Sequence, residues 1–481
     1  MEKDVSRDLI TLPIPELIKR LAVPASVGYF FHTMYNVVDT YFGGLISTQV
    51  LAALSLSLPV FFIIIAVCTG ISTGTTALIA NALGAGDREK AKMLAVQGLA
   101  FFGIVTSAAL TLIGIFSSPY LFSVLGASDA YMVTCLKYMD TIFLGTVLFM
   151  LVSMLNAILT ALGNTRPYRN FLIAGFLLNI ILDPWFIFGG LGLPPLGIIG
   201  IALATVVIQG IGCLYLGAMV SRTGLFTKGD LKRLVPSYGP FKEIARQGLP
   251  ASVNLLTIGL GIFVITYFVS AFGKGAVAAY GVAMRVEQTV LVPAIGLNVA
   301  TLTIVAQNNG ARLFRRVQET IHRNLVYGGI MMAIGAVGIL ILAPQLMALF
   351  THDKKVIEIG AVYLRIDALA LYAYVVLSVN IAALQGMKKP MYALWIGLYR
   401  QIVAPFLLFY LLTRVLDVGL IGIWWGIFSI TWSATLITIF YARLQLRKVR
   451  SHLVDDPPVS FTQQAQPSTA CCPKPDRKGA I

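Results

Sequence analysis

The sequence predicts an all-α integral membrane protein with twelve transmembrane helices in two lobes of six. Three observations carry this prediction: the composition, twelve long apolar runs, and an internal repeat. Of 481 residues, 57% are hydrophobic and 12% are charged, and the mean hydropathy is +0.83. Soluble domains carry about 25% charged residues. The composition therefore excludes a soluble enzyme, a disordered protein and a collagen-like fibre.

Long apolar segments follow one another along the whole chain. A helix needs about 20 mostly apolar residues to cross a bilayer. Twelve segments meet this length, at 16–46, 50–83, 92–117, 131–162, 168–190, 196–221, 241–272, 276–309, 317–349, 356–386, 391–414 and 419–445. The runs are continuous rather than alternating, which favours helices over membrane strands.

Basic residues concentrate in alternate connecting segments. With both termini in the cytoplasm, 28 of the 36 Lys and Arg residues fall on the inner side and 6 on the outer side. This asymmetry is the positive-inside rule, and it predicts a multi-pass protein of the cytoplasmic (inner) membrane. It also accounts for the net charge of +15, so we expect no nucleic-acid partner. The five cysteines are scattered, without the spacing of a disulfide framework or a metal site.

The second half of the chain repeats the first. PASVGYFFHTMYNVVDTYF at 24–42 and PASVNLLTIGLGIFVITYF at 250–268 match at eight of nineteen positions, at an offset of 226. The same offset pairs Gly70 with Gly296 and Gly84 with Gly310. Because each repeat holds six spans, an even number, both enter the membrane from the same side. Their pseudo-twofold axis therefore runs along the membrane normal, as in transporters built from parallel repeats.

The repeat also sets the expected domain boundaries. We expect an N-terminal six-helix lobe at 1–221, a basic cytoplasmic linker at 222–240, and a C-terminal six-helix lobe at 241–446. Residues 447–481 contain several prolines and no apolar run. This composition is typical of a disordered cytoplasmic tail.

Differences between the repeats indicate a functional site. Asp39 corresponds to Ile265 in the second half, and Asn179 and Asp183, four residues apart on one helix face, correspond approximately to Gln401 and Pro405. A carboxylate in the bilayer interior costs about 2.5–3.5 kcal/mol. A low dielectric and a second carboxylate nearby both favour protonation. The pair predicts a proton or sodium site; the alternative is a carboxylate that only caps or pairs.

Other polar residues in the first half can complete such a site. Thr205 and Gln209 lie four apart in one span, and Asn36 and Tyr35 precede Asp39. We expect Asn36, Tyr35 and Gln209 to line a substrate cavity, and a lone histidine, His32, to be a packing residue rather than a proton relay. Pro24 removes a backbone donor from the first span and permits a hinge, or a static kink.

The second half carries its own ionisable residues at membrane depth. Glu287 is expected either to pair with Arg400 as structural support, which we favour, or to form a second coupling site. Arg285 lies two residues from Glu287 and so points to a different helix face. Asp367 is expected near the outer end of its span, where a charged side chain costs little free energy.

The motifs together resemble the multidrug and toxic compound extrusion (MATE) family over residues 10–446. They are LAVPASVGYFFHTMYNVVDTYFGGL, ALGAGDREKAK with AQNNGARLFRRV, ALGNTRPY with ALQGMKKP, LLNIILDPWFIFG and GIIGIALAT. The resemblance implies a V-shaped cavity between the lobes and export driven by protons or sodium through alternating access. It implies cation coupling by residues matching the family motifs, which are Asp39, Asn179, Asp183 and Thr205, and bending at Pro24.

An acidic residue that some branches carry near Ile258 is absent, so the chain resembles the DNA-damage-inducible F branch, which favours protons over sodium. We expect a monomeric exporter of amphiphilic, often cationic drugs or dyes in the lipid bilayer, with no cofactor besides the transported H+ or Na+. A flippase of lipid-linked precursors and a major-facilitator transporter are alternatives. An intramembrane enzyme is disfavoured, because the four histidines are dispersed and no phosphate-binding loop is present.

Overall fold

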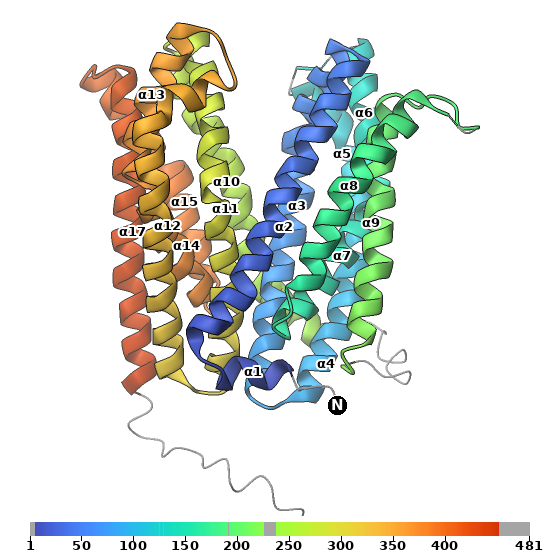
Figure 1. Cartoon of the computed structure of the whole chain (residues 1–481), viewed down its shortest axis with the longest axis vertical. Coiled ribbons are helices and arrows are strands. Elements are labelled where there is room, and N and C mark those ends of the chain that lie inside the picture. The colour runs from blue at the N-terminus through green and yellow to red at the C-terminus, as the bar shows by residue number, and fades with distance from the viewer. Residues whose placement is uncertain (1–4, 125, 128, 191, 226–236, 452–481) are drawn as a thin grey trace, which may run out of the picture.

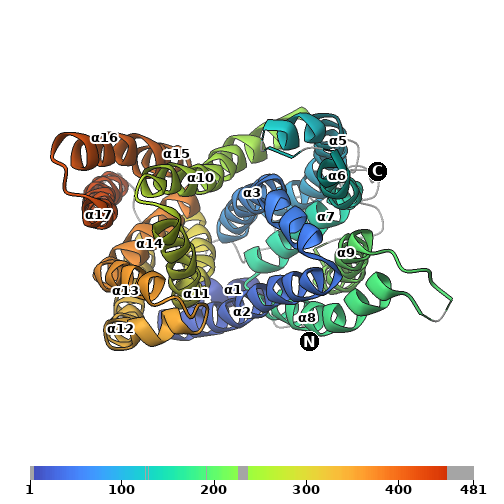
Figure 2. The same ribbon diagram turned by 90° about the horizontal axis from the view of Figure 1, so that it is seen from above.

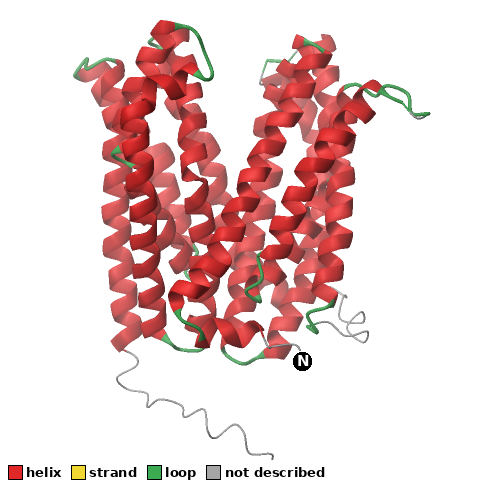
Figure 3. Cartoon of the chain, viewed as in Figure 1, coloured by secondary structure: helices red, strands yellow, loops and turns green. Residues whose placement is uncertain are grey.

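The computed structural model describes residues 5–124, 126–127, 129–190, 192–225 and 237–451, without the side chains of 5–7, 129–130 and 449–451. Within these ranges every regular element is a helix, and the only β-type pairing is a single bridge between Gly190 and Leu193 (Figure 3). The all-α class predicted from the sequence is confirmed.

The first repeat supplies the helices that pack into the N-terminal lobe. They are α1 (Val5–Thr11), α2 (Ile14–Ile46), α3 (Thr48–Gly84), α4 (Arg88–Gln97), the π-helical segment η1 (Gly98–Thr106), α5 (Ser107–Val124), α6 (Asp129–Leu144), α7 (Thr146–Ala161), α8 (Arg166–Phe188) and α9 (Ile198–Ser221). The segments α4, η1 and α5 follow one another without a break and make one span.

The second repeat supplies the C-terminal lobe. Its helices are α10 (Tyr238–Ser270), α11 (Lys274–Gly310), α12 (Phe314–Ala348), α13 (Lys354–Ala368), α14 (Leu371–Gly386), α15 (Met391–Leu398), η3 (Tyr399–Val403), α16 (Ala404–Tyr410), η4 (Leu411–Val415) and α17 (Leu420–Ser451). The segments from α15 to η4 again form one span, interrupted by two π-helical stretches.

These helices correspond to the twelve predicted spans. Nine described helices, or eleven if each bent pair counts as one, are long and apolar enough to cross a membrane. The bent pairs are α6 with α7, at 45°, and α13 with α14, at 52°. The twelfth span is α2, which has 33 residues but carries His32, Asn36 and Asp39 and is more polar.

Local sequence signals account for several helix ends. Ser47 accepts a hydrogen bond from the Val50 amide at 3.1 Å and begins α3. Asp87 accepts one from the Lys90 amide at 2.9 Å and begins α4. Each side chain satisfies a backbone donor that has no partner within its helix.

The helices form two bundles that diverge toward the top of Figure 1 and meet at its base. From above, α2 to α9 gather on one side and α10 to α17 on the other (Figure 2). The larger hydrophobic clusters follow this division, one drawing almost entirely on residues 50–244 and the other on residues 268–430. Each lobe therefore has its own core.

Two helix crossings at the base join the lobes in a symmetric way. A Cβ added to Gly70 of α3 would overlap the backbone of Ser252 in α10, and one added to Gly296 of α11 would overlap Ser26 in α2. The Ser252 hydroxyl donates to the Val67 carbonyl at 3.4 Å. These helix pairs can approach this closely only because the contact position is glycine.

The equivalent crossing has an equivalent hydrogen bond, from the Ser26 hydroxyl to the Pro293 carbonyl at 3.4 Å. Ser26 and Val67 are related to Ser252 and Pro293 by the offset of 226. Each repeat therefore packs its glycine against the serine of the other repeat.

Buried amides strengthen the same contact. Asn81 donates to the Gly386 carbonyl at 2.8 Å, and Gln307, its repeat counterpart, donates to the Ala161 carbonyl at 2.9 Å. Asn309 donates to the Asn81 side-chain oxygen at 2.7 Å. We call this end of the molecule, where α2 and α10 begin and α3 and α11 end, the closed end.

The expected linker and tail are only partly described. The N-terminal lobe ends with α9 at Ser221, and α10 begins at Tyr238. Most of the linker, residues 226–236, lies outside the described residues. Helix α17 continues to Ser451, and residues 452–481 of the expected tail also lie outside the described part.

Candidate ion-coupling site

Four residues predicted to couple ions come together inside the N-terminal lobe. Asp39 lies on α2, Asn179 and Asp183 on α8, and Thr205 on α9. Asn179 and Asp183 are both 0% exposed. Their spacing of four residues places both on the face of α8 that packs inside the lobe.

Asp39 and Asn179 are directly joined. The Asn179 side-chain nitrogen donates to Asp39 Oδ1 at 2.9 Å. The two residues are 140 positions apart in sequence. A hydrogen bond to an ionised carboxylate is about twice as strong as one between neutral groups. The bond therefore links α2 to α8 most firmly when Asp39 is deprotonated.

Asp183 is the most isolated group of the cluster. Both of its carboxylate oxygens are buried and accept no hydrogen bond from another donor in the described chain. It lies within hydrogen-bonding reach of Asp39 once one of the two carboxyl groups carries a proton. No ion pair of either carboxylate with a Lys or Arg occurs among the described residues. Two adjacent carboxyl groups without a fixed cation are suited to share a proton.

Tyrosines complete the cluster. The Tyr35 hydroxyl donates to the Thr205 hydroxyl at 3.0 Å, and Thr205 donates to the Ile201 carbonyl at 3.1 Å. Tyr138 of α6, which is 8% exposed, lies close enough to interact electrostatically with both Asp39 and Asp183. Tyr138 could not be identified from the sequence, because nothing in the span 131–162 marks it.

The remaining predicted residues lie around this cluster. Asn36 is exposed and donates to the carbonyl of His32 at 3.0 Å. Gln209 lies on α9 with its side-chain oxygen buried and unbonded. Pro24 is buried within α2, two residues before Ser26. A bend at Pro24 would therefore act on the crossing between α2 and α11.

The equivalent place in the C-terminal lobe has no acid. Ile265 takes the place of Asp39 and packs on the lobe's own core. The side chain of Gln401 lies against Gly261, which is the repeat counterpart of Tyr35. An amide side chain therefore occupies this place in both lobes, as Asn179 in the first and Gln401 in the second. The carboxylates Asp39 and Asp183 have no acidic counterpart in the second lobe.

A second polar cluster lies elsewhere in the C-terminal lobe. Tyr363 donates to Glu287 Oε2 at 2.8 Å, and Tyr374 donates to Asp367 Oδ1 at 3.1 Å. The Arg400 guanidinium lies 5.4 Å from the centre of the Tyr374 ring. A position over the ring face is favourable for a cation.

The expectation for Asp367 is wrong: it does not lie near the outer end of its span but at the C-terminal end of α13, beside the bend to α14, and is 2% exposed. Within the described residues Glu287 accepts a hydrogen bond from Tyr363, and Arg400 interacts with it electrostatically without forming a direct ion pair. The bend turns Asp367 inward, where Tyr374 of the next helix can reach it. Arg285 is exposed, as its different helix face predicts.

Comparison with known proteins places the chain in a family. The family model described as MatE matches residues 24–185 and 250–411, one copy in each repeat. The chain therefore belongs to the MATE family of membrane transporters, as the motifs indicated. The first matched range contains Asp39, Asn179 and Asp183.

Individual relatives agree with this assignment. A probable multidrug resistance protein NorM from Thermotoga maritima is 27% identical over 441 residues, covering 89% of this chain and 93% of that protein. An FAD transporter from Shewanella oneidensis is 26% identical over 401 residues, covering 82% and 87%. The multidrug export protein MepA from Staphylococcus aureus is 23% identical over 447 residues, covering 92% and 97%.

Solved structures show the same architecture. A MATE protein in complex with MaL6 superposes with a TM-score of 0.86 at 25% identity, covering 94% of this chain and all of that one. An outward-facing multidrug resistance MATE transporter gives a TM-score of 0.86, also at 25% identity, covering 94% and 99%. Two lobes that separate at one end are thus common to these proteins and to this chain.

Proposed function

We propose that this protein is a secondary active multidrug exporter that exchanges protons for amphiphilic, often cationic small molecules by alternating access. The observation that carries the proposal is the pair of carboxyl groups, Asp39 and Asp183, held in one lobe, with which no Lys or Arg of the described residues forms an ion pair. Such groups are rare inside membranes and normally serve ion or proton pathways. The names of the relatives from Thermotoga maritima and Staphylococcus aureus support multidrug export.

The proposed cycle begins with the lobes joined at the closed end, which we place on the cytoplasmic side in agreement with the positive-inside count. A proton taken up from outside removes one negative charge from the Asp39–Asp183 pair by neutralising Asp39. Neutral Asp39 holds Asn179 less firmly, because the hydrogen bond is no longer charge-assisted. The contact between α2 and α8 loosens, and the bound cation loses an attractive negative charge and leaves.

The cavity between the lobes then opens to the cytoplasm, and the proton is released there. The proton gradient drives the cycle, and the membrane potential contributes about 2.3 kcal/mol per 100 mV for each net charge that one exchange moves across the membrane. Pro24 supplies the hinge, since it lies on the same helix as Asp39 and two residues before the crossing at Ser26. In this mechanism the asymmetry between the repeats limits coupling to the first lobe.

Transport by purified protein in vesicles tests the proposal. We expect uptake of ethidium or another cationic dye into inverted vesicles when a proton gradient is imposed, and no uptake under a sodium gradient alone. The Asp39→Asn variant should lose the response to the proton gradient. Sodium-driven uptake would overturn proton coupling, and undiminished proton-driven uptake by the variant would overturn the role of Asp39.

A second class of cargo is suggested by the relative named as an FAD transporter. A dinucleotide is anionic, and the acidic N-terminal lobe does not favour it. The vesicle assay distinguishes the two classes directly, with FAD and ethidium offered to the same preparation. FAD uptake without dye uptake would replace the multidrug assignment while leaving the transporter class intact.

A further inference from the structure

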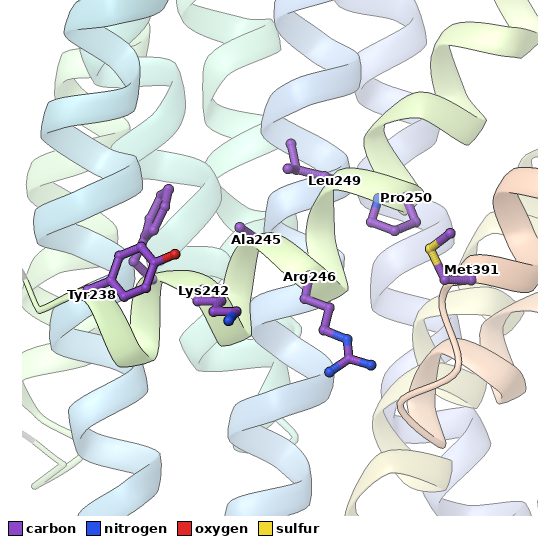
Figure 4. A pocket seen from close by; sticks show the side chains of 8 residues that line it. Tyr238, Lys242, Ala245, Arg246, Leu249, Pro250 and Met391 are labelled. Atoms are coloured by element: carbon purple, nitrogen blue, oxygen red, sulfur yellow. The ribbon is translucent and has the colours of Figure 1, made fainter.

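A cavity opens at the closed end beside the first turns of α10, where this helix also packs on the N-terminal lobe. It has a volume of about 370 Å³ and lies between the start of α10 and the start of α15. Its lining residues are Tyr238, Phe241, Lys242, Ala245, Arg246, Leu249, Pro250 and Met391. Figure 4 shows Lys242 and Arg246 on one side of α10, with Met391 of α15 close to Pro250.

The charges in this cavity are of one sign. Lys242 and Arg246 lie four residues apart, are both exposed, and form no ion pair within the described chain. Among the described residues that line the cavity, none is acidic. The nearest acid in sequence, Glu243, belongs to a different face of α10 and binds Lys90 of α4 at 3.2 Å. The two cations are therefore available to an anion from outside the protein.

The position of the cavity relative to the bilayer follows from the length of the apolar part of α10. The apolar run of this helix begins at Leu249 and ends at Ser270, which at about 1.5 Å per residue gives roughly 33 Å. The hydrocarbon core of a bilayer is about 30 Å thick. Leu249, Pro250 and Met391 are thus at the edge of the hydrocarbon, and Lys242 and Arg246 are at the level of the headgroups.

Apolar side chains provide a matching surface on the hydrocarbon side. Leu249 is 53% exposed and Met391 is 48% exposed. Tyr238 is 72% exposed at the headgroup end of the cavity, a position that tyrosine favours in membrane proteins. The cavity therefore changes from cationic to apolar along the direction in which a phospholipid changes from phosphate to acyl chain.

We propose that this cavity is a binding site for one anionic phospholipid of the leaflet at the closed end. Its phosphate lies between Lys242 and Arg246, and an acyl chain lies along Leu249, Pro250 and Met391. Basic pockets between membrane helices on the cytoplasmic side bind anionic headgroups in this way. The site is separate from the Asp39–Asp183 cluster, and its existence does not depend on the proposed transport function.

Native mass spectrometry of the full-length protein with added lipid tests the site. The probes are phosphatidylglycerol and phosphatidylcholine with identical acyl chains. We expect one phosphatidylglycerol to bind preferentially, and the double variant Lys242→Gln/Arg246→Gln to lose this preference. A basic residue near an anionic surface changes binding about five-fold, so the loss of both weakens it about thirty-fold.

Two variants control for general charge and for folding. Arg443→Gln/Arg447→Gln removes the same charge from an exposed pair on α17 of the same lobe, also four residues apart. This variant should still bind phosphatidylglycerol in preference to phosphatidylcholine. Lys242→Arg/Arg246→Lys retains the charge in the cavity and should also bind. Equal losses in the cavity and control double variants would show diffuse attraction and overturn the site. Equal binding of the two lipids by the unmodified protein would overturn it as well.

Discussion

The crossing between α3 and α10 offers a direct test of how the closed end is held together. A Cβ on Gly70 would overlap the backbone nitrogen and the hydroxyl of Ser252. The Gly70→Val variant therefore cannot be accommodated without separating the two helices. Overpacking of this kind costs about 1–3 kcal/mol. This cost destabilises only the state in which the closed end is intact. The population of that state, relative to the state in which the lobes separate at this end, should therefore fall about 5- to 150-fold.

Distances between spin labels at the opposite end measure this shift. Tyr41 and Tyr267 are repeat counterparts, 63% and 70% exposed, on α2 and α10. With labels there, in a cysteine-free background, we expect a single long distance in the parent protein. The Gly70→Val variant should add a population with a shorter distance, because opening one end of the lobes brings the other ends together.

A matched control separates this effect from the general cost of valine in a helix. Gly217 of α9 has no atom within 4 Å of an added Cβ, so Gly217→Val should keep the parent distance. A Gly70→Val protein that remains folded and shows the parent distribution would refute the idea that this crossing holds the closed end.

Three further predictions concern other contacts. Tyr363→Phe removes the hydrogen bond to Glu287 and should lower the free energy of unfolding by about 1–3 kcal/mol; an unchanged melting temperature in detergent would contradict a structural role. Asn81→Ala removes the donor to the Gly386 carbonyl and the acceptor for Asn309. In the spin-label experiment it should add the same short-distance population as Gly70→Val. An unaltered distance distribution would show that these bonds do not hold the closed end. Lys90→Gln breaks a half-exposed ion pair with Glu243 and should change stability by less than about 1 kcal/mol, so a large loss of dye transport would point to an unrecognised role.

Much of the fold was predictable because it depends on properties that are local in sequence. The length and polarity of each apolar run give the spans, and the offset of 226 gives the symmetry. The repeat even identified Gly70 with Gly296 and Gly84 with Gly310. It did not show why these glycines recur. The structure supplies the reason: each one packs against the other repeat at the closed end.

The finer geometry depends on side chains that are far apart in sequence. The sequence indicated that Asp39, Asn179 and Asp183 differ from their counterparts, but not that Asn179 bonds to Asp39. Tyr138 has no distinguishing neighbours in its span, so only the three-dimensional packing of the lobe shows that it lies near the carboxylates. Asp367 was misplaced because the 52° bend between α13 and α14 leaves no clear signal in an apolar run.

The central claim is that protonation of the Asp39–Asp183 pair and binding of cargo oppose each other. The most direct measurement is the affinity of the purified protein for a cationic dye at acidic and at alkaline pH. Coupling between two sites typically amounts to 5- to 150-fold in affinity. We predict weaker binding at acidic pH by a factor in this range, and an Asp39→Asn variant whose affinity hardly changes with pH. An equally strong pH dependence in the variant would contradict the account.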